Sequence, residues 1–284
     1  MNIAVTGGKG GTGKSTVAIN IATILSKKYK VALVDADVEC PNDHFLLSTN
    51  LKNEKKEYIF RPRFEYKKCV KCSLCVKNCA ENAIVMFKEG YPFLIPTLCS
   101  GCKACQLVCH FDAIQNGQKE IGSTYLSKVN ENLTIVTGVL KEGEEKSYPM
   151  VLFTKKRAEE CGAEIKIFDT SAGTGNHVAA AIESADLVIA VTEPTPLGIH
   201  DIKMIMNLLS KQGKKGYVVI NRSDLIPMDK SVIADYPIIG ELPYSDLIVQ
   251  CYLNGKSIVE SYPECKESKI FESIIKKVMS WNLL

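Results

Sequence analysis

The stretch that decides the fold is Gly8-Lys9-Gly10-Gly11-Thr12-Gly13-Lys14-Ser15, close to the start of the chain. It matches the pattern G-x-x-x-x-G-K-[ST], whose glycines let backbone N–H groups approach the phosphates of a nucleotide. In such a loop the Lys14 ammonium reaches the β- and γ-phosphates, and the Ser15 hydroxyl binds Mg²⁺. We therefore predict a nucleotide site from Gly8 to Thr16. A glycine-rich turn that matches by chance is the alternative.

The sequence on both sides of the loop favours the nucleotide site. Asn2–Thr6 is a short β-rich run, and Ser15–Lys28 has helical periodicity with an apolar face. Val31–Val34 then predicts a second buried strand. A strand before the loop and a helix after it are the context that the phosphate-binding motif requires. The three elements form a βαβ unit, which implies a parallel sheet.

The βαβ rhythm stops between Arg61 and about Ser123 and then resumes. Further strands are predicted at Leu133–Val136, Glu164–Phe168, Leu187–Val191 and Tyr217–Ile220, with helices at Thr154–Cys161, His200–Lys211 and Lys269–Leu284. The fold class is therefore α/β, a doubly wound and mostly parallel sheet with a small α+β domain inserted in it. We place the larger domain at residues 1–59 and 123–284 and the insert at residues 60–122.

Composition limits the classes of function. Of the 284 residues, 46% are hydrophobic and 24% charged, and the formal charge is only +3, so nothing indicates a nucleic-acid partner. No signal peptide is recognisable, and no apolar run is long enough to span a membrane, so we expect a cytoplasmic protein. The charge runs Lys52–Lys56 and Lys141–Lys146 predict solvated loops. The last helix is amphipathic, and we expect it to pack on the sheet rather than to lie on a membrane.

Cysteines are concentrated in the insert. The chain has twelve, and eight of them form two blocks with the spacing C-x2-C-x2-C-x3-C, thirty residues apart. The blocks are Cys69-Val-Lys-Cys72-Ser-Leu-Cys75-Val-Lys-Asn-Cys79 and Cys99-Ser-Gly-Cys102-Lys-Ala-Cys105-Gln-Leu-Val-Cys109. Because cytoplasmic thiols stay reduced, these residues predict metal ligands rather than disulfides. Zinc is the alternative to iron–sulfur clusters, but zinc sites usually take two ligands from a turn, not three with a fourth just behind.

The cysteine blocks resemble those of bacterial two-cluster ferredoxins, and this resemblance covers the insert alone. In that family the fourth cysteine of each block ligates the other cluster. The resemblance thus implies one [4Fe–4S] cluster on Cys69, Cys72, Cys75 and Cys109 and a second on Cys99, Cys102, Cys105 and Cys79. The proline usual after the fourth cysteine is replaced by Ala80 and His110, which changes the local turn but removes no ligand.

The second lysine of the phosphate loop, Lys9, resembles the deviant Walker A loop of the MinD, ParA, Mrp and nitrogenase-iron-protein superfamily. Asp35-Ala36-Asp37 resembles the second acidic motif of that superfamily, and Asp169-Thr170-Ser171-Ala172-Gly173-Thr174-Gly175 resembles its switch II. Asn221-Arg222 resembles its adenine-recognition segment. Thr192-Glu193-Pro194-Thr195-Pro196-Leu197-Gly198 is similar to the Mrp branch.

The superfamily resemblance implies roles for these residues. Lys9 would reach the partner's phosphates across a homodimer, and Asp37 would orient the attacking water. Asp35 and Asp169 would support Mg²⁺ and the γ-phosphate switch. Asn221 would read adenine, with Arg222 beside it. An ordinary strand-end loop is the alternative for the acidic pair, although residues after a parallel strand do lie at the edge where ligands bind.

These expectations combine into a Mg²⁺-dependent ATPase that couples its nucleotide state to redox chemistry or to metallocentre maturation. One alternative is an iron–sulfur carrier of the Mrp type, but Cys251 and Cys265 are too far apart for the C-terminal C-x-x-C of that type. A nitrogenase-iron-protein-like donor would need a cysteine shortly after switch II, and none occurs there. The last alternative is a non-enzymatic, nucleotide-gated partner switch. The redox partner or iron–sulfur client is not identifiable from the sequence.

Overall fold

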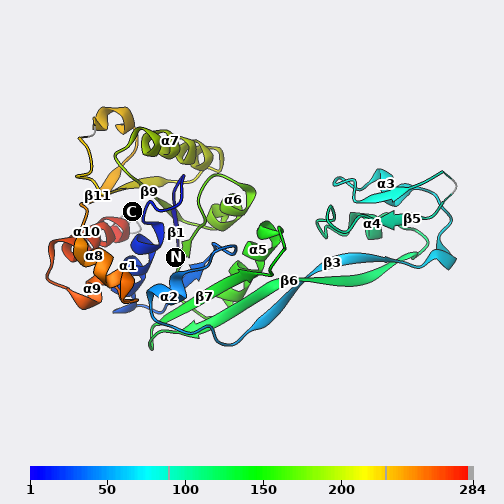
Figure 1. Ribbon diagram of the computed structural model, residues 1–284, viewed down its shortest axis with the longest axis horizontal. Coiled ribbons are helices and arrows are strands. Elements are labelled where there is room, and N and C mark those ends of the chain that lie inside the picture. Colours follow the sequence, from blue (N-terminus) through cyan, green and yellow to red (C-terminus); the bar gives the residue numbers. More distant parts are fainter. Residues whose placement is uncertain (89, 228, 281–284) are drawn as a thin grey trace. The chain divides into compact units, whose positions relative to one another are not determined.

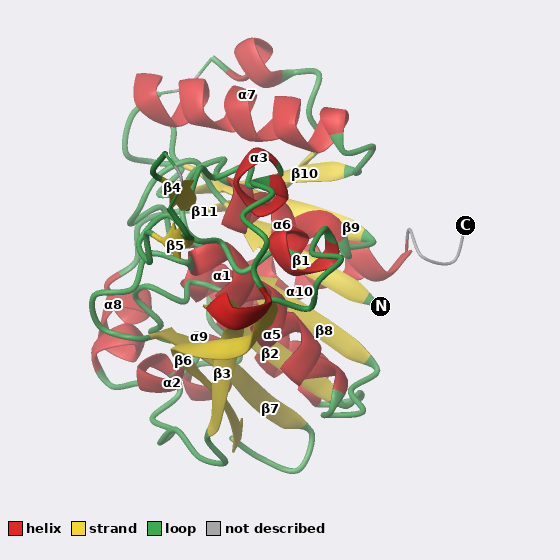
Figure 2. Ribbon diagram, turned by 90° about the vertical axis from the view of Figure 1, so that its right-hand side faces the viewer, coloured by secondary structure: helices red, strands yellow, loops and turns green. Residues whose placement is uncertain are grey.

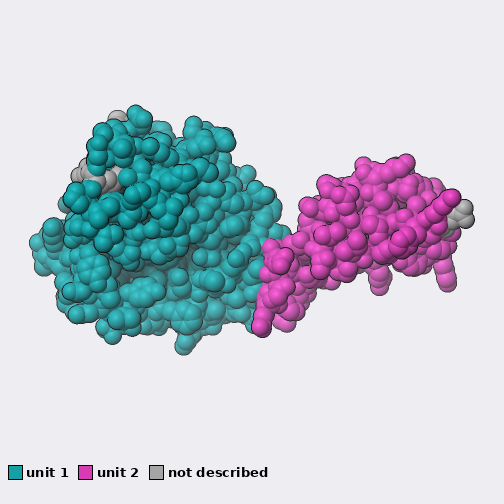
Figure 3. Space-filling view, turned by 45° about the horizontal axis from the view of Figure 1, so that its top comes forward, with its two compact units in different colours: residues 1–55, 123–140, 147–284 teal, residues 56–122, 141–146 magenta. Residues whose placement is uncertain are grey.

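The computed structural model describes residues 1–88, 90–227 and 229–280 (Figure 1). The chain divides into two compact units, one of residues 1–55, 123–140 and 147–284 and the other of residues 56–122 and 141–146 (Figure 3). The edges of the insert at residues 60 and 122 remain predictions from the sequence. The small unit also contains 56–59 and 141–146, which the sequence assigned to the larger domain.

A sheet of parallel strands forms the centre of the large unit. Its strands are β1 (Asn2–Thr6), β2 (Val31–Asp35), β7 (Leu133–Leu140), β8 (Ile165–Asp169), β9 (Leu187–Thr192), β10 (Gly216–Asn221) and β11 (Ile238–Leu242). The strand order is β11-β10-β9-β1-β8-β2-β7-β6-β3. The last two strands connect the units: β3 (Lys55–Phe64) leads the chain into the small unit, and β6 (Ile114–Lys128) leads it back. The parallel α/β fold predicted from the sequence is confirmed.

Helices cover both faces of this sheet (Figure 2). On one face α1 (Lys14–Ser26) and α10 (Lys266–Ser280) pack over one set of strand residues, and on the other α5 (Ser147–Glu159), α6 (Asn176–Glu183) and α7 (Pro196–Lys211) pack over the alternate set. Adjacent residues such as Leu33 and Val34 belong to different core clusters. This follows from the alternation of side chains along a strand. Both faces are buried, as parallel sheets require.

The predicted helices differ from the observed ones mainly at their starts. α7 begins at Pro196, because the Thr195 side chain accepts a hydrogen bond from the Gly198 N–H (3.0 Å) and proline suits the first helical position. α5 begins at Ser147, because the buried Met150 and Val151 extend its apolar face. The earlier start adds about one turn to α7 and about two turns to α5.

The structure also tests two smaller predictions, of which one is wrong and one is confirmed. Lys55 and Lys56 lie in β3, so a loop over the whole of Lys52–Lys56 is wrong, although both side chains are exposed. The packed terminal helix is confirmed for α10, because Phe271, Ile274 and Val278 are buried in the core. The predicted residues 281–284 lie outside the described residues. Over the described ranges, no helix has both the length and the apolar character needed to cross a membrane.

The remaining elements are short. The large unit also contains α2 (Asp43–Leu46), α8 (Asp246–Leu253), α9 (Ile258–Ser261) and the 3₁₀ turn η2 (Lys230–Ile233). The small unit contains η1 (Tyr66–Lys68), α3 (Leu74–Lys77), α4 (Ala104–Leu107) and an antiparallel pair, β4 (Ile84–Met86) with β5 (Pro92–Leu94). Elements this short were not predicted from the sequence.

Candidate functional site

The phosphate loop lies between β1 and α1, at the carboxyl edge of the sheet. Gly11 and Gly13 have φ of +78° and +94°, a region that residues with a Cβ rarely adopt. A Cβ on Gly13 would also lie 2.4 Å from Nδ2 of Asn221. That nitrogen instead donates a hydrogen bond to the carbonyl oxygen of Thr12 (2.9 Å). The loop thus needs glycine both for its backbone angles and for its contact with the end of β10.

The Lys14 side chain is buried within the loop, with 8% of the residue exposed. Its ammonium donates to the carbonyl oxygen of Lys9 (3.1 Å), which holds it inside the curve of the backbone. Burial lowers the pKa of Lys14, while the carboxylates of Asp169 and Asp37 act in the opposite direction. A bound phosphate would supply the additional negative charge that this buried cation lacks.

A group of carboxyl groups lies behind the loop. Asp35 and Asp169 end neighbouring strands and are register partners. Asp35 accepts backbone hydrogen bonds from Asn42 (2.9 Å) and Asp43 (3.1 Å). Burial raises the pKa of Asp169 to about 7 and those of Asp35 and Asp43 well above the usual range, and their mutual repulsion adds to the shift of Asp35 and Asp43. The group therefore favours a bound proton or a nearby cation.

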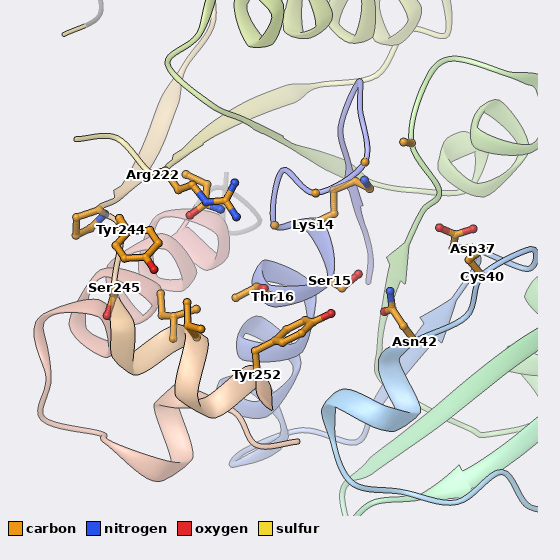
Figure 4. Close-up of a pocket in the computed structure, with 18 residues that line it drawn as sticks. Lys14, Ser15, Thr16, Asp37, Cys40, Asn42, Arg222, Tyr244, Ser245 and Tyr252 are labelled. Carbon is orange, nitrogen blue, oxygen red and sulfur yellow. The ribbon is translucent and has the colours of Figure 1, made fainter. Parts of the chain in front are cut away.

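An elongated cavity of about 460 Å³ opens beside the loop (Figure 4). This volume lies within the range of small-molecule sites. Arg222 and Tyr244 lie at one end and Asp37 and Cys40 at the other, with Lys14 between them. Such a shape fits a ligand with an aromatic base at one end and phosphates in the middle. Burial also raises the pKa of Asp37, which lies at the end of the cavity away from Arg222.

The predicted nucleotide residues divide into two sets. Those that line the cavity are Gly10, Gly11, Gly13, Lys14, Ser15, Thr16, Asp37, Asn221 and Arg222. The others, Gly8, Lys9, Thr12, Asp35 and Asp169, lie in or behind the loop without lining it. Three lining residues were not predicted: Tyr244 and Ser245, in the connection between β11 and α8, and Tyr252, in α8. No motif marks these residues, so only the parallel register of β11 beside β10 could have placed them there.

Lys9 is engaged within its own chain. Its ammonium lies 2.8 Å from Oε2 of Glu193, whose other oxygen accepts from the Arg222 guanidinium. The Glu193 side chain is buried, and its two cationic partners hold its pKa below the usual value against the effect of burial. The sequence analysis quoted Glu193 only as part of a motif. An acidic residue directly after the buried strand β9 was the available signal.

The two cysteine blocks of the small unit have matching backbones. α3 and α4 occupy the same position in their blocks, and each follows a left-handed residue, Ser73 (φ +60°) and Lys103 (φ +66°). A second matching pair, Asn82 (φ +50°) and Asp112 (φ +48°), follows the fourth cysteine of each block. Left-handed angles are uncommon outside glycine, so their recurrence at an offset of thirty residues shows that the sequence repeat is also a structural repeat.

Cysteines from both blocks meet in the core of the small unit. One cavity there is lined by Cys69, Cys72, Cys75 and Cys109, so three come from the first block and one from the second. The small core around Phe60 also contains the other fourth cysteine, Cys79, and Cys105 of the second block. Burial raises the pKa of Cys75, and that of Cys105 to about 11, which disfavours their thiolates until a cation offsets the charge.

Comparison with known proteins identifies the family of this chain. The sequence model of the CobQ/CobB/MinD/ParA nucleotide-binding domain matches residues 3–258. The chain belongs to this family. It is 37% identical to an uncharacterized protein of Methanocaldococcus jannaschii over 92% of each chain. It is also 24% identical to the cytosolic Fe-S cluster assembly factor Nubp2 homolog of Aedes aegypti, over 97% of this chain and 95% of that relative.

A solved structure supports the MinD/ParA fold. The septum site-determining protein MinD from Pyrococcus horikoshii, complexed with Mg-ADP, superposes with a TM-score of 0.60. It is 20% identical and covers 98% of this chain and 95% of that one. This likeness shows the P-loop NTPase fold of the MinD/ParA type, and the family match assigns the chain a nucleotide-binding domain.

The buried carboxyl groups behind the loop lead to a prediction about pH. A carboxyl group whose pKa is raised by folding binds more protons in the folded state, so its contribution to stability falls as pH rises from about 4 to about 7. Asp43 is fully buried, and neither of its carboxylate oxygens has a hydrogen-bond partner that satisfies the usual geometry. Asp43→Asn should therefore stabilise the nucleotide-free protein at pH 8 by about 1–3 kcal/mol.

The measurement is the unfolding midpoint of the wild type and Asp43→Asn at pH 5 and pH 8. The gain should be larger at pH 8, with a shift of about 2–4 °C per kcal/mol. Asp235→Asn, at an exposed position, is the control and should change neither midpoint. An equal gain at both pH values would show that repulsion among the buried carboxylates is not the cause.

Proposed function

We propose that this protein is a Mg²⁺-dependent, dimeric ATPase that couples its nucleotide state to redox chemistry or metallocentre maturation at two [4Fe–4S] clusters. The observation that carries the proposal is the cavity lined by Cys69, Cys72, Cys75 and Cys109 in a chain of the MinD/ParA family. A nucleotide site and a cysteine centre on one chain favour a link between ATP and the metal centre.

The cysteine arrangement suits a cubane. Each of its irons takes a separate cysteine thiolate, so the four sulfurs must surround a cluster rather than meet at one point. Among the described residues, no group of three or more His, Cys, Asp or Glu side chains is placed around a single ion. The four cysteines nevertheless line one cavity, and Cys79 accepts a hydrogen bond from the Ala83 N–H (3.2 Å). Cys99, Cys102, Cys105 and Cys79 would hold the second cluster, by the symmetry of the repeat.

The geometry of the phosphate loop supports the ATPase half of the proposal. The N–H groups of Gly10 to Gly13 and the start of α1 would bind the phosphates, and Lys14 would neutralise them. Ser15 would bind Mg²⁺, and Asp37 would orient water at its end of the cavity. In the dimer, the Lys9 ammonium would leave Glu193 and contact the phosphates of the nucleotide bound to the second copy of the chain. Asn221 and Arg222 would lie beside the base.

A second candidate is an iron–sulfur carrier, which the similarity to the Nubp2 homolog favours. In that function the clusters would be cargo and would transfer to an acceptor protein. Cys251 is buried in α8, and Cys265 precedes α10 and contacts Ser268, so they form no C-x-x-C pair. A carrier would thus have to release the clusters of the small unit. A third candidate, a nucleotide-gated partner switch, would need neither redox change nor release.

The test is an anaerobic redox titration followed by electron paramagnetic resonance, with ADP and with a non-hydrolysable ATP analogue. Coupling between sites is typically about 1–3 kcal/mol, which corresponds to a midpoint shift of roughly 40–130 mV for a one-electron couple. Because coupling is reciprocal, reduction should change the nucleotide affinity by the same factor. Iron and acid-labile sulfide should each amount to about eight per chain.

Each candidate function has its own outcome. Equal midpoints with both nucleotides, together with unchanged nucleotide affinity on reduction, would contradict coupling. Transfer of iron and sulfide to an apo-protein during ATP turnover would then support the carrier. Zinc without sulfide would refute the cluster assignment itself.

A further inference from the structure

A row of aromatic rings reaches the surface of the small unit beside the first cysteine cavity. Phe64 stacks on Tyr66 with ring centroids 6.0 Å apart, and Tyr66 contacts Tyr91 at 5.0 Å. The Lys71 ammonium lies 4.5 Å from the centre of the Tyr91 ring. Tyr66 and Tyr91 are 43% and 44% exposed. The row thus begins inside the unit and ends in an exposed surface with a cation on it.

This surface is continuous with the cysteine cavity. Phe64, Val70 and Lys71 line the cavity together with the four cysteines, and Val70 is 55% exposed. Lys67 and Lys68, in the turn that begins at Tyr66, are also exposed. We define the lysine–tyrosine patch as Tyr66, Lys67, Lys68, Val70, Lys71 and Tyr91. The patch contains three lysines, and Glu65 is its acidic neighbour in sequence.

The second cysteine block lacks such a surface. Lys71 corresponds to Gly101 in the repeat, and the Lys103 ammonium lies over the Phe60 ring (5.9 Å), a residue of the small core. Cys99 and Cys105 are each 8% exposed, although Cys102 is exposed, whereas all four cysteines of the first block are half-buried or exposed. The cysteines of the first block are therefore the more accessible, an asymmetry that a purely structural pair of metal centres would not need.

We propose that the lysine–tyrosine patch is the docking surface for a small acidic electron-carrier protein, which exchanges electrons with the first cysteine centre. The inference rests on the proposed function, since it requires a cluster on Cys69, Cys72, Cys75 and Cys109. Exposed aromatic and aliphatic groups ringed by lysines suit a transient interface with an acidic partner. The partner is a protein rather than a nucleic acid because the exposed rings pack on one another and on Lys71, which leaves their faces partly covered.

The exchange is a single-electron step. The reduced carrier loses one electron and the cluster gains it, or the reverse, and no bond forms or breaks between the two proteins. Electrostatic attraction would bring the centres together, so the association should weaken as salt is added.

The probe is an acidic flavodoxin, whose flavin fluorescence reports binding to the anaerobic holoprotein at low ionic strength. The test variant is Lys67→Glu/Lys68→Glu/Lys71→Glu. Its matched control is Lys77→Glu/Lys88→Glu/Lys103→Glu, which makes the same charge change at exposed lysines that do not line the first cavity. We expect the test variant to weaken binding by about tenfold or more and the control by less than about threefold. Tyr91→Ala should weaken binding without changing its salt dependence.

Three results would overturn the proposal. One is that the wild type does not bind flavodoxin at low salt, and another is that the control weakens binding as much as the test variant. The third is that a single-stranded oligonucleotide binds equally well and is lost in the same variant, which would make the patch a general polyanion site. Measuring the iron and sulfide content of the protein distinguishes failure of the docking proposal from failure of the proposed function. A protein that contains both clusters but does not bind flavodoxin contradicts only the docking proposal. Bleaching of the clusters by dithionite should be equal in all the variants.

Discussion

Lys14→Ala should weaken ATP binding by about 100-fold or more and abolish hydrolysis. The side chain is the buried cation at the centre of the cavity, and it already lies in the curve of the loop where the β- and γ-phosphates would bind. Loss of a charge-assisted hydrogen bond in such a site costs about 1.5–3 kcal/mol, and the lost neutralisation adds to it. Equilibrium binding of a fluorescent ATP analogue measures the effect.

The control for this prediction is Lys27→Ala, an exposed lysine at the end of α1, which should bind ATP normally. Because Lys14 also faces the carboxylates of Asp169 and Asp37, the nucleotide-free variant must first be shown to unfold cooperatively. Lys14→Met, which keeps the length of the side chain, provides a second test if the alanine variant is unstable. A folded variant that still binds ATP tightly would contradict the assignment of the loop.

Lys9→Ala distinguishes the deviant loop from an ordinary phosphate loop. The Lys9 side chain leaves the cavity and pairs with Glu193, so its removal should spare nucleotide binding. Hydrolysis should fall, because the proposed partner of Lys9 in the active dimer is the phosphate group of the other subunit. If Lys9→Ala protein dimerised and hydrolysed ATP normally, Lys9 would have no role across the interface.

The local motifs of this chain could be predicted from sequence because their spacing reflects their chemistry. A phosphate loop needs Gly13 for both its angle and its contact with Asn221, and the motif therefore appears as a fixed run of residues. Six parallel strands were recognisable as apolar runs because both faces of the sheet are buried there, whereas the less buried β11 was missed. The matching turns at Ser73 and Lys103 likewise follow from the repeated spacing of the cysteines.

Long-range contacts could not be predicted in the same way. Tyr244 and Tyr252 reach the cavity because β11 pairs beside β10, and no local pattern in the sequence specifies that pairing. The link between Lys9 and Glu193 joins the ends of two strands that are almost two hundred residues apart in the chain. Strand β3 was missed because it alternates exposed and buried residues and carries charges at its start. These features depend on tertiary partners, which a single sequence does not identify.

The exchange of cysteines between the two blocks is the remaining prediction, and iron counting in paired variants tests it. Cys109 lines the cavity of Cys69, Cys72 and Cys75, so Cys69→Ala and Cys109→Ala should remove the same cluster. The double variant Cys69→Ala/Cys109→Ala should then retain about four irons per chain, whereas Cys69→Ala/Cys79→Ala should lose both clusters and retain almost none. Both variants lack Cys69 and one fourth cysteine, so general destabilisation affects them alike. If each block bound its own cluster, the two results would be reversed.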